Sequence, residues 1–253
     1  MKPRQFDALK TPFKDNRTGV RLLGVFLAAE VVLLGTSALS AALFAAAGWS
    51  PADETQPLWP LPVLLLVPAL VTAAAVVVGV RLYGGGPRRE RVQRELLGTP
   101  RRRDVRVGAL FGACGLVLVV PAAAMWSAWT DGGGSPVGHV LDGREPDLGA
   151  GLAIFATVWL IAPIAEEVLF RGVLWRALER WGWNRWLVFA TTTVAFAVSH
   201  VDWQRTPLLV VVSIPIGLAR MFTGTVAAAV AAHQVNNFLP ALATLLTGLG
   251  VLD

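Results

Sequence analysis

Seven stretches of this sequence are almost wholly apolar, and their recurrence limits the fold more than any other feature. They cover residues 22–47, 61–80, 107–125, 148–165, 187–198, 208–218 and 226–252. A helix needs about 20 apolar residues to cross roughly 30 Å of hydrocarbon. The sequence therefore predicts an all-α, polytopic transmembrane helical bundle. We expect seven or eight spans, because Pro240 either bends one long final helix or separates two short ones.

Composition agrees with a membrane protein. Of the 253 residues, 55% are hydrophobic and only 15% are charged, a balance typical of membrane chains. Residues 1–21 are polar and the first apolar run has full length, unlike the short run of a cleavable signal, so we interpret it as a retained span. Cys114 is the only cysteine, which excludes an intrachain disulfide and a metal site built from cysteines.

Basic residues alternate between the two sides of the predicted spans. They are frequent in the arm 1–21 and in the loop 84–106, whereas the loop 50–57 has none and the loop 130–147 has only Arg144. This alternation is the positive-inside pattern and places the N-terminus in the cytoplasm. We expect the protein to lie in the plasma membrane. Orientation accounts for the net charge of +5 without nucleic acid as a partner, and attraction to anionic membrane lipids is a second use.

Two adjacent carboxylates, Glu166 and Glu167, end the fourth apolar run. Ionisable residues inside a membrane are costly and indicate a functional site by default. Arg171 follows Glu167 by four residues, the favourable order for an ion pair on a helix. Glu166 is rotated from Glu167 by about 100° and is free to face another group. Glu30, isolated in the first run, is interpreted as a packing or snorkelling residue, with a place in a polar cavity as the alternative.

Further polar residues of catalytic type interrupt the later runs. His200 ends the fifth run, and His233 and Asn237 share one helix face in the last. The inner interface is placed at the basic residues Arg176, Arg180, Arg185 and Arg220. At 1.5 Å per residue, Glu166, His200 and His233 then lie at similar depths, roughly 15–22 Å inside. These residues can therefore meet in a polar cavity among the C-terminal helices.

Two acids, two imidazoles and an amide in a protected cavity suit hydrolysis. A carboxylate can act as a general base on water, and histidine and asparagine side chains can stabilise an oxyanion. Zinc is an alternative, because Glu166, His200 and His233 make a set of two histidines and one carboxylate. The zinc-binding helix with two histidines around a glutamate, four residues apart, is absent.

The motifs Glu166-Glu167-x-x-x-Arg171, Phe196-x-x-x-His200 and His233-x-x-x-Asn237, in this order within apolar helices, resemble the CAAX protease and bacteriocin-processing family (CPBP, or Abi) of intramembrane endopeptidases. The resemblance covers about residues 148–240 and divides the chain into a cytoplasmic arm (1–21), N-terminal transmembrane helices (22–147) and a catalytic region (148–253).

The resemblance implies a role for each motif residue. Glu166 is the general base, His200 holds the attacking water, and His233 and Asn237 stabilise the oxyanion. Glu167 pairs with Arg171 to shape the site, to which Phe196 also belongs. We favour a mechanism without a cofactor and keep zinc as the alternative. The implied substrate is a peptide or protein, lipid-modified at its C-terminus in eukaryotic relatives.

Two other classes of function are compatible with these residues. A proton-coupled transporter also places glutamate and histidine inside the membrane, but it is expected to show inverted repeats, which this sequence lacks. A non-catalytic scaffold or immunity protein keeps the fold without the reaction and tolerates loss of Glu166. The sequence contains no signal for an oligomeric state.

Overall fold

The computed structural model describes residues 14–83, 96–130, 140–141, 144, 146–249 and 251. Within these ranges the chain is helical and contains no strand. Most of the predicted cytoplasmic arm and the first half of the basic loop, residues 84–95, lie outside the described residues. The predicted all-α fold is confirmed.

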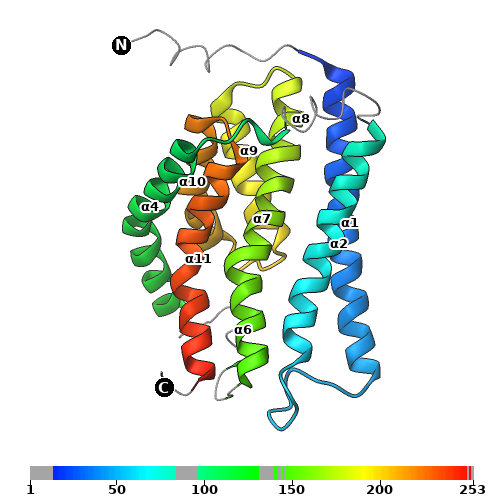
Figure 1. Cartoon of the computed structure of the whole chain (residues 1–253), viewed down its shortest axis with the longest axis vertical. Coiled ribbons are helices and arrows are strands. Elements are labelled where there is room, and N and C mark those ends of the chain that lie inside the picture. The colour runs from blue at the N-terminus through cyan, green and yellow to red at the C-terminus, as the bar shows by residue number, and fades with distance from the viewer. Residues whose placement is uncertain are drawn as a thin grey trace.

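Seven long helical units make up the described bundle. They are α1 (Asn16–Ala46), α2 (Pro60–Tyr83), α4 (Arg102–Trp129), a continuous run of α6 (Leu148–Ala156), η4 (Thr157–Ile161), α7 (Ala162–Glu167), η5 (Val168–Leu174) and α8 (Trp175–Arg180), then α9 (Arg185–Ser199), α10 (Thr206–Thr223) and α11 (Val226–Gly248). Pro240 lies inside α11 without dividing it, so the final run forms one helix rather than two. In Figure 1, α1 and α2 lie on one side, α4 lies on the other, and the run from α6 to α8 passes between them.

The outer surface of the bundle is suited to lipid. Five of the described helical units are long and apolar enough to cross a membrane: α1, α2, α4, the run Leu148–Arg180 and α10. Large apolar side chains point outwards, with Val31, Val117 and Met125 each at least 70% exposed. Apolar surface of this extent is unusual on a soluble monomer. The chain is an integral membrane protein.

Local sequence sets several helix ends. Asp15 accepts a hydrogen bond from the Thr18 amide at the start of α1, and Asn184 accepts two from the first turn of α9. These side chains satisfy amides that have no partner within the helix. Gly224 ends α10 with φ of +76°, a left-handed conformation that glycine adopts without steric cost. The chain can therefore turn back sharply into α11.

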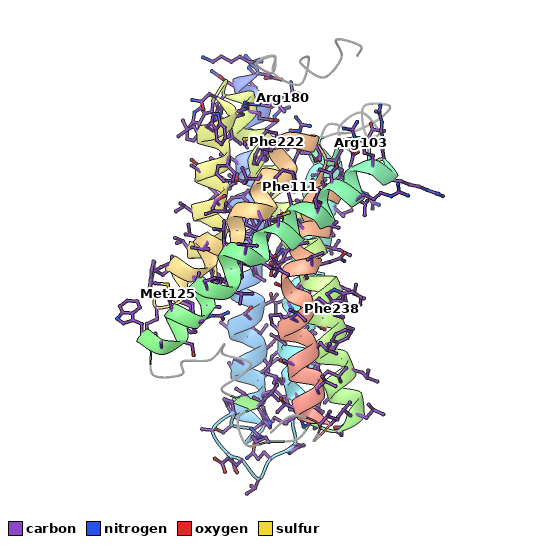
Figure 2. All side chains as sticks on the ribbon, turned by 90° about the vertical axis from the view of Figure 1, so that its left-hand side faces the viewer. Arg103, Phe111, Met125, Arg180, Phe222 and Phe238 are labelled. Atoms are coloured by element: carbon purple, nitrogen blue, oxygen red, sulfur yellow. The ribbon has the colours of Figure 1, made fainter. Side chains whose placement is uncertain are left out.

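Helix α4 packs closely on α10 and α11 through a row of glycines. Gly108 and Gly112 face the backbone of α11 at Ala228 and Ala232, and Gly115 faces Pro215 of α10. Small residues allow membrane helices to approach closely, which increases their packing contacts. Figure 2 shows α4 crossing the bundle obliquely, with Phe111 beside Phe222, whose rings stack 5.8 Å apart.

Gly108→Ala is expected to weaken this packing. The added Cβ would lie 2.1 Å from the Ala228 carbonyl oxygen, so the two helices must separate. Overpacking of this kind costs about 1–3 kcal/mol, which should lower the thermal unfolding midpoint in detergent. Gly24→Ala in α1 is the matched control, because no atom lies within 4 Å of its Cβ position. Equal midpoints for the two variants would contradict the close approach of α4 to α11.

Helices α9 and α10 form a hairpin whose turn lies near mid-height of the bundle (Figure 1). Helix α9 has 15 residues and extends only about 22 Å. The end of α4 contacts the turn, where the Trp126 indole donates to the Gln204 carbonyl over 3.1 Å and the Arg205 guanidinium lies 5.9 Å from the Trp126 ring centre. His200 lies at the start of this turn and lines the cavity described below.

Candidate active site

Glu167 is at the centre of a buried polar network. Its Oε1 accepts a hydrogen bond from Arg171 Nη1 over 2.9 Å and lies 3.0 Å from His233 Nδ1. Both Glu167 and Arg171 are fully buried. Arg171 also donates from Nη2 to the Ser213 hydroxyl. The ion pair predicted from the four-residue spacing is present, and His233 is a further partner of the same carboxylate oxygen.

The contact with Glu167 sets the hydrogen positions on His233. A carboxylate oxygen accepts, so Nδ1 of His233 carries the hydrogen and Nε2 is left free in the neutral ring. Nε2 lies 3.8 Å from Glu166 Oε2. A carboxylate that orients a histidine in this way is a common arrangement behind reactive histidines. Glu167 therefore directs His233 towards Glu166.

Arg220 is buried within the protein, with 1% of its surface exposed. Its Nε donates to the Arg171 carbonyl over 2.8 Å, and its guanidinium lies 5.5 Å from the Trp175 ring centre. The Arg171 carbonyl belongs to η5, a π-helical segment, and such segments are frequent at functional sites. Arg220 therefore supports the helical segment that carries Arg171, the partner of Glu167.

Asn237 also contacts a π-helical segment. Its Nδ2 donates to the Val158 carbonyl over 3.1 Å, within η4. In a π-helix that carbonyl would receive the amide five residues later, but position 163 is proline and has no N–H. Asn237 replaces the missing donor. One of its two amide hydrogens remains for another partner.

Glu166 faces a cavity of about 420 Å³. Its side chain is 29% exposed, whereas that of Glu167 is fully buried. The walls are mainly apolar and come from α1, α2, the run from η4 to η5 and the end of α9, and His200 lines the cavity together with Glu166. The sequence predicted a cavity among the C-terminal helices. The structure adds α1 and α2 to its lining.

Phe196 holds the two histidines in place. Its ring is 4.8 Å from that of His200 and 5.6 Å from that of His233, and the Arg171 guanidinium lies 4.7 Å from its centre. Nδ1 of His200 lies 2.8 Å from the Phe196 carbonyl oxygen. Since a carbonyl only accepts, Nδ1 is the donor, and Nε2 of His200 remains free for a ligand or water.

Val201 directly follows His200 and also lines the cavity. Its φ is +53°, and a β-branched residue rarely adopts this left-handed conformation. Such strained residues persist where the surrounding structure holds them, and they cluster at active sites. The strain coincides with the sharp turn that leaves His200 at the end of α9.

The structure thus joins the separate sequence motifs. Direct contacts link Glu166, Glu167, Arg171, Phe196 and His233, and His200 joins them through Phe196 and the cavity. Neither His233 nor Asn237 lines the cavity. Sequence reasoning missed Ser213, which has no signal of its own within an apolar run, and the contribution of α1 and α2.

The possible zinc ligands do not form a metal-binding group in the described part of the chain. No set of three His, Cys, Asp or Glu side chains there is arranged to hold a metal ion. In particular, Glu166, His200 and His233 do not converge as a ligand set.

Comparison with known families agrees with the motifs. Residues 148–239 match the family model described as Rce1-like, type II CAAX prenyl endopeptidase Rce1-like. The match runs from the start of α6 into α11 and includes every motif residue. Neither the curated proteins nor the solved structures contain a significant match to the chain.

Proposed function

We propose that this chain, whose residues 148–239 belong to the Rce1-like type II CAAX prenyl endopeptidase family, is an intramembrane endopeptidase that uses a water activated by Glu166. The main support for this proposal is that the two adjacent acids differ in burial and in partners. Glu167 is fully buried and engaged by Arg171 and His233, while Glu166 is partly exposed on the cavity wall. A general base needs this access to water and substrate.

In the first step, Glu166 accepts a proton from a water that His200 holds through Nε2. The water oxygen bonds to the carbonyl carbon of the substrate, and the carbonyl oxygen becomes an oxyanion. His233, when protonated on Nε2, and the spare amide hydrogen of Asn237 donate to that oxyanion, although neither side chain lines the cavity and both must approach it to do so. The C–N bond then breaks, and Glu166 returns the proton to the leaving nitrogen. Oriented donors of this kind are a major source of rate enhancement.

The proposed substrate is a peptide or protein segment with an apolar group beside the scissile bond. The side chains of Leu33, Leu64 and Leu65 belong to the cavity wall, and Glu166 and His200 are its charged and titratable members. Such a wall suits apolar side chains or a C-terminal lipid. Prenylated and unmodified forms of one peptide, compared in the same assay, distinguish these two substrates. Membrane lipids surround the bundle on its apolar outer surface.

Hydrolysis in water labelled with oxygen-18 tests the proposed function. The purified protein in nanodiscs is incubated with membrane-associated peptides, and the products are analysed by mass spectrometry. We expect two fragments, the N-terminal one carrying one oxygen-18 atom in its new carboxylate. A non-catalytic scaffold or a transporter produces no such fragment, and uncleaved peptides across a broad library would contradict the proposal.

Metal removal is expected to leave this activity unchanged. The proposed steps use only protein side chains, and the described structure has no metal-binding group. The measurement is the initial cleavage rate before and after dialysis against EDTA and 1,10-phenanthroline, with metal content determined on the same samples. Activity that disappears with the metal and returns with added zinc would instead establish the zinc-dependent version.

A further inference from the structure

Among the described buried polar atoms without a hydrogen-bond partner, two belong to the N-terminal helices. They are Oε1 of Glu30 in α1 and Oγ1 of Thr72 in α2. Buried polar groups are nearly always hydrogen-bonded, and an exception needs an explanation. The roles proposed above for the C-terminal helices use neither atom.

Glu30 extends the face of α1 that lines the cavity. Leu33, Leu34 and Ser37 line it, and they follow Glu30 by three, four and seven residues, which places all four on one side of the helix. The strongest charged neighbour of Glu30 is Glu166, whose charge has the same sign. Among the described residues, no ion pair joins Glu30 to a basic side chain. Glu30 is therefore an acid beside an acid, without a cation.

Thr72 lines the cavity directly and is only 4% exposed. Threonines in the other helices commonly bond to the carbonyl one turn earlier, as Thr157, Thr192 and Thr223 do over 2.7–2.9 Å. Thr72 makes no such bond. One turn before it, Pro68 has no N–H, so the Leu64 carbonyl lacks its usual helical donor. The Leu64 carbonyl is therefore an acceptor without its usual donor, and the Thr72 hydroxyl can accept as well as donate.

The cavity has no permanent cation to match these acceptors. Its lining contains neither lysine nor arginine, and Glu166 is its only acidic member, with Glu30 next to it. Arg171 is committed to Glu167 and Ser213. Charges interact strongly where water is scarce, and a cleft lined by one sign of charge concentrates ligands of the opposite sign.

We propose that Glu30 and Thr72 bind a cationic side chain of the substrate, a lysine or arginine close to the scissile bond. This inference rests on the proposed function and specifies its substrate. The ammonium or guanidinium offsets the charge of Glu30 and donates hydrogen bonds to Thr72 and to the Leu64 carbonyl. Glu166 keeps its own charge and remains able to accept the proton from water.

Peptide binding to the Glu166→Gln variant tests this proposal without requiring cleavage. The experiment uses two fluorescent peptides that differ only at one residue near the scissile position, which is lysine in one and norleucine in the other. Their sequence is that of a cleaved peptide, or of a library peptide if none is cleaved. Norleucine keeps the chain length and removes the charge. We expect the lysine peptide to bind about tenfold more tightly in nanodiscs, and Glu30→Gln in the same background to bring the ratio close to one. Glu30→Asp should restore part of the preference, and Thr72→Val should reduce it.

Glu54→Gln in the exposed loop after α1 is the matched control and should keep the full preference. Thermal unfolding of each variant identifies any that fail to fold. If Glu30→Gln does not fold, the lysine preference is measured on Glu30→Asp instead. The proposed site would be overturned if the preference for the lysine peptide survives Glu30→Gln. It would also be overturned if the Glu166→Gln parent shows no such preference. If the preference is present but no peptide is ever hydrolysed, the binding site stands and the proposed function fails.

Discussion

Glu166→Gln is expected to abolish peptide hydrolysis while the protein stays folded. Glutamine keeps the size of the side chain but cannot accept the proton of water. Loss of a general base reduces rates by about 10²–10⁴, so the rate of fragment formation should fall by the same factor. The measurement is the initial rate of fragment formation under single-turnover conditions, with folding checked by the thermal unfolding midpoint.

The contrast between the two glutamates sharpens this prediction. Glu166 has a partly exposed side chain and a 3.8 Å approach to His233 as its one ion-pair contact in the described structure, so its neutral replacement breaks few contacts. Glu54→Gln removes an exposed carboxylate of the same type and should leave the rate unchanged. If Glu166→Gln retains substantial turnover in purified form, another group activates the water and the glutamate mechanism is wrong.

Arg171→Met is expected to destabilise the protein more than any other single change discussed above. It leaves the fully buried carboxylate of Glu167 without its cation and removes the contacts of Arg171 with Ser213 and the Phe196 ring. Removing one partner of a buried ion pair costs about 3–5 kcal/mol, because the remaining charge stays buried without compensation. Denaturant titration in mixed micelles measures this free energy of unfolding.

Two further variants separate the charge effect from lost packing. Arg176→Met breaks a partly exposed pair with Glu179, and surface pairs contribute at most about 1 kcal/mol. The double variant Glu167→Gln, Arg171→Met removes both buried charges and should recover part of the lost stability. A loss as small as that of Arg176→Met would mean that the buried pair contributes little to folding.

His233 shows most clearly which contacts the sequence could predict and which it could not. The sequence grouped it with Asn237 because both lie on one helix face, and the structure gives them different partners. His233 reaches the carboxylate of Glu167, whereas Asn237 replaces the amide that Pro163 cannot supply to the Val158 carbonyl. Helical spacing defines which side chains share a face. It does not define which of several acceptors on a neighbouring helix each one meets.

The helical membrane fold and the residues of the three motifs could be predicted from the amino-acid sequence, since both depend on local quantities. Apolar length sets whether a helix can span lipid, and spacing along one helix sets the Glu167–Arg171 pair. Only the tertiary structure decided that α1 and α2 enclose the cavity with Glu166, that Arg220 is buried behind Arg171, and that α9 ends at mid-height. These features arise from packing between helices that are distant in the chain. Glycine contacts and π-helical turns set the distances between these helices, and no local sequence pattern indicates which helix will be the partner.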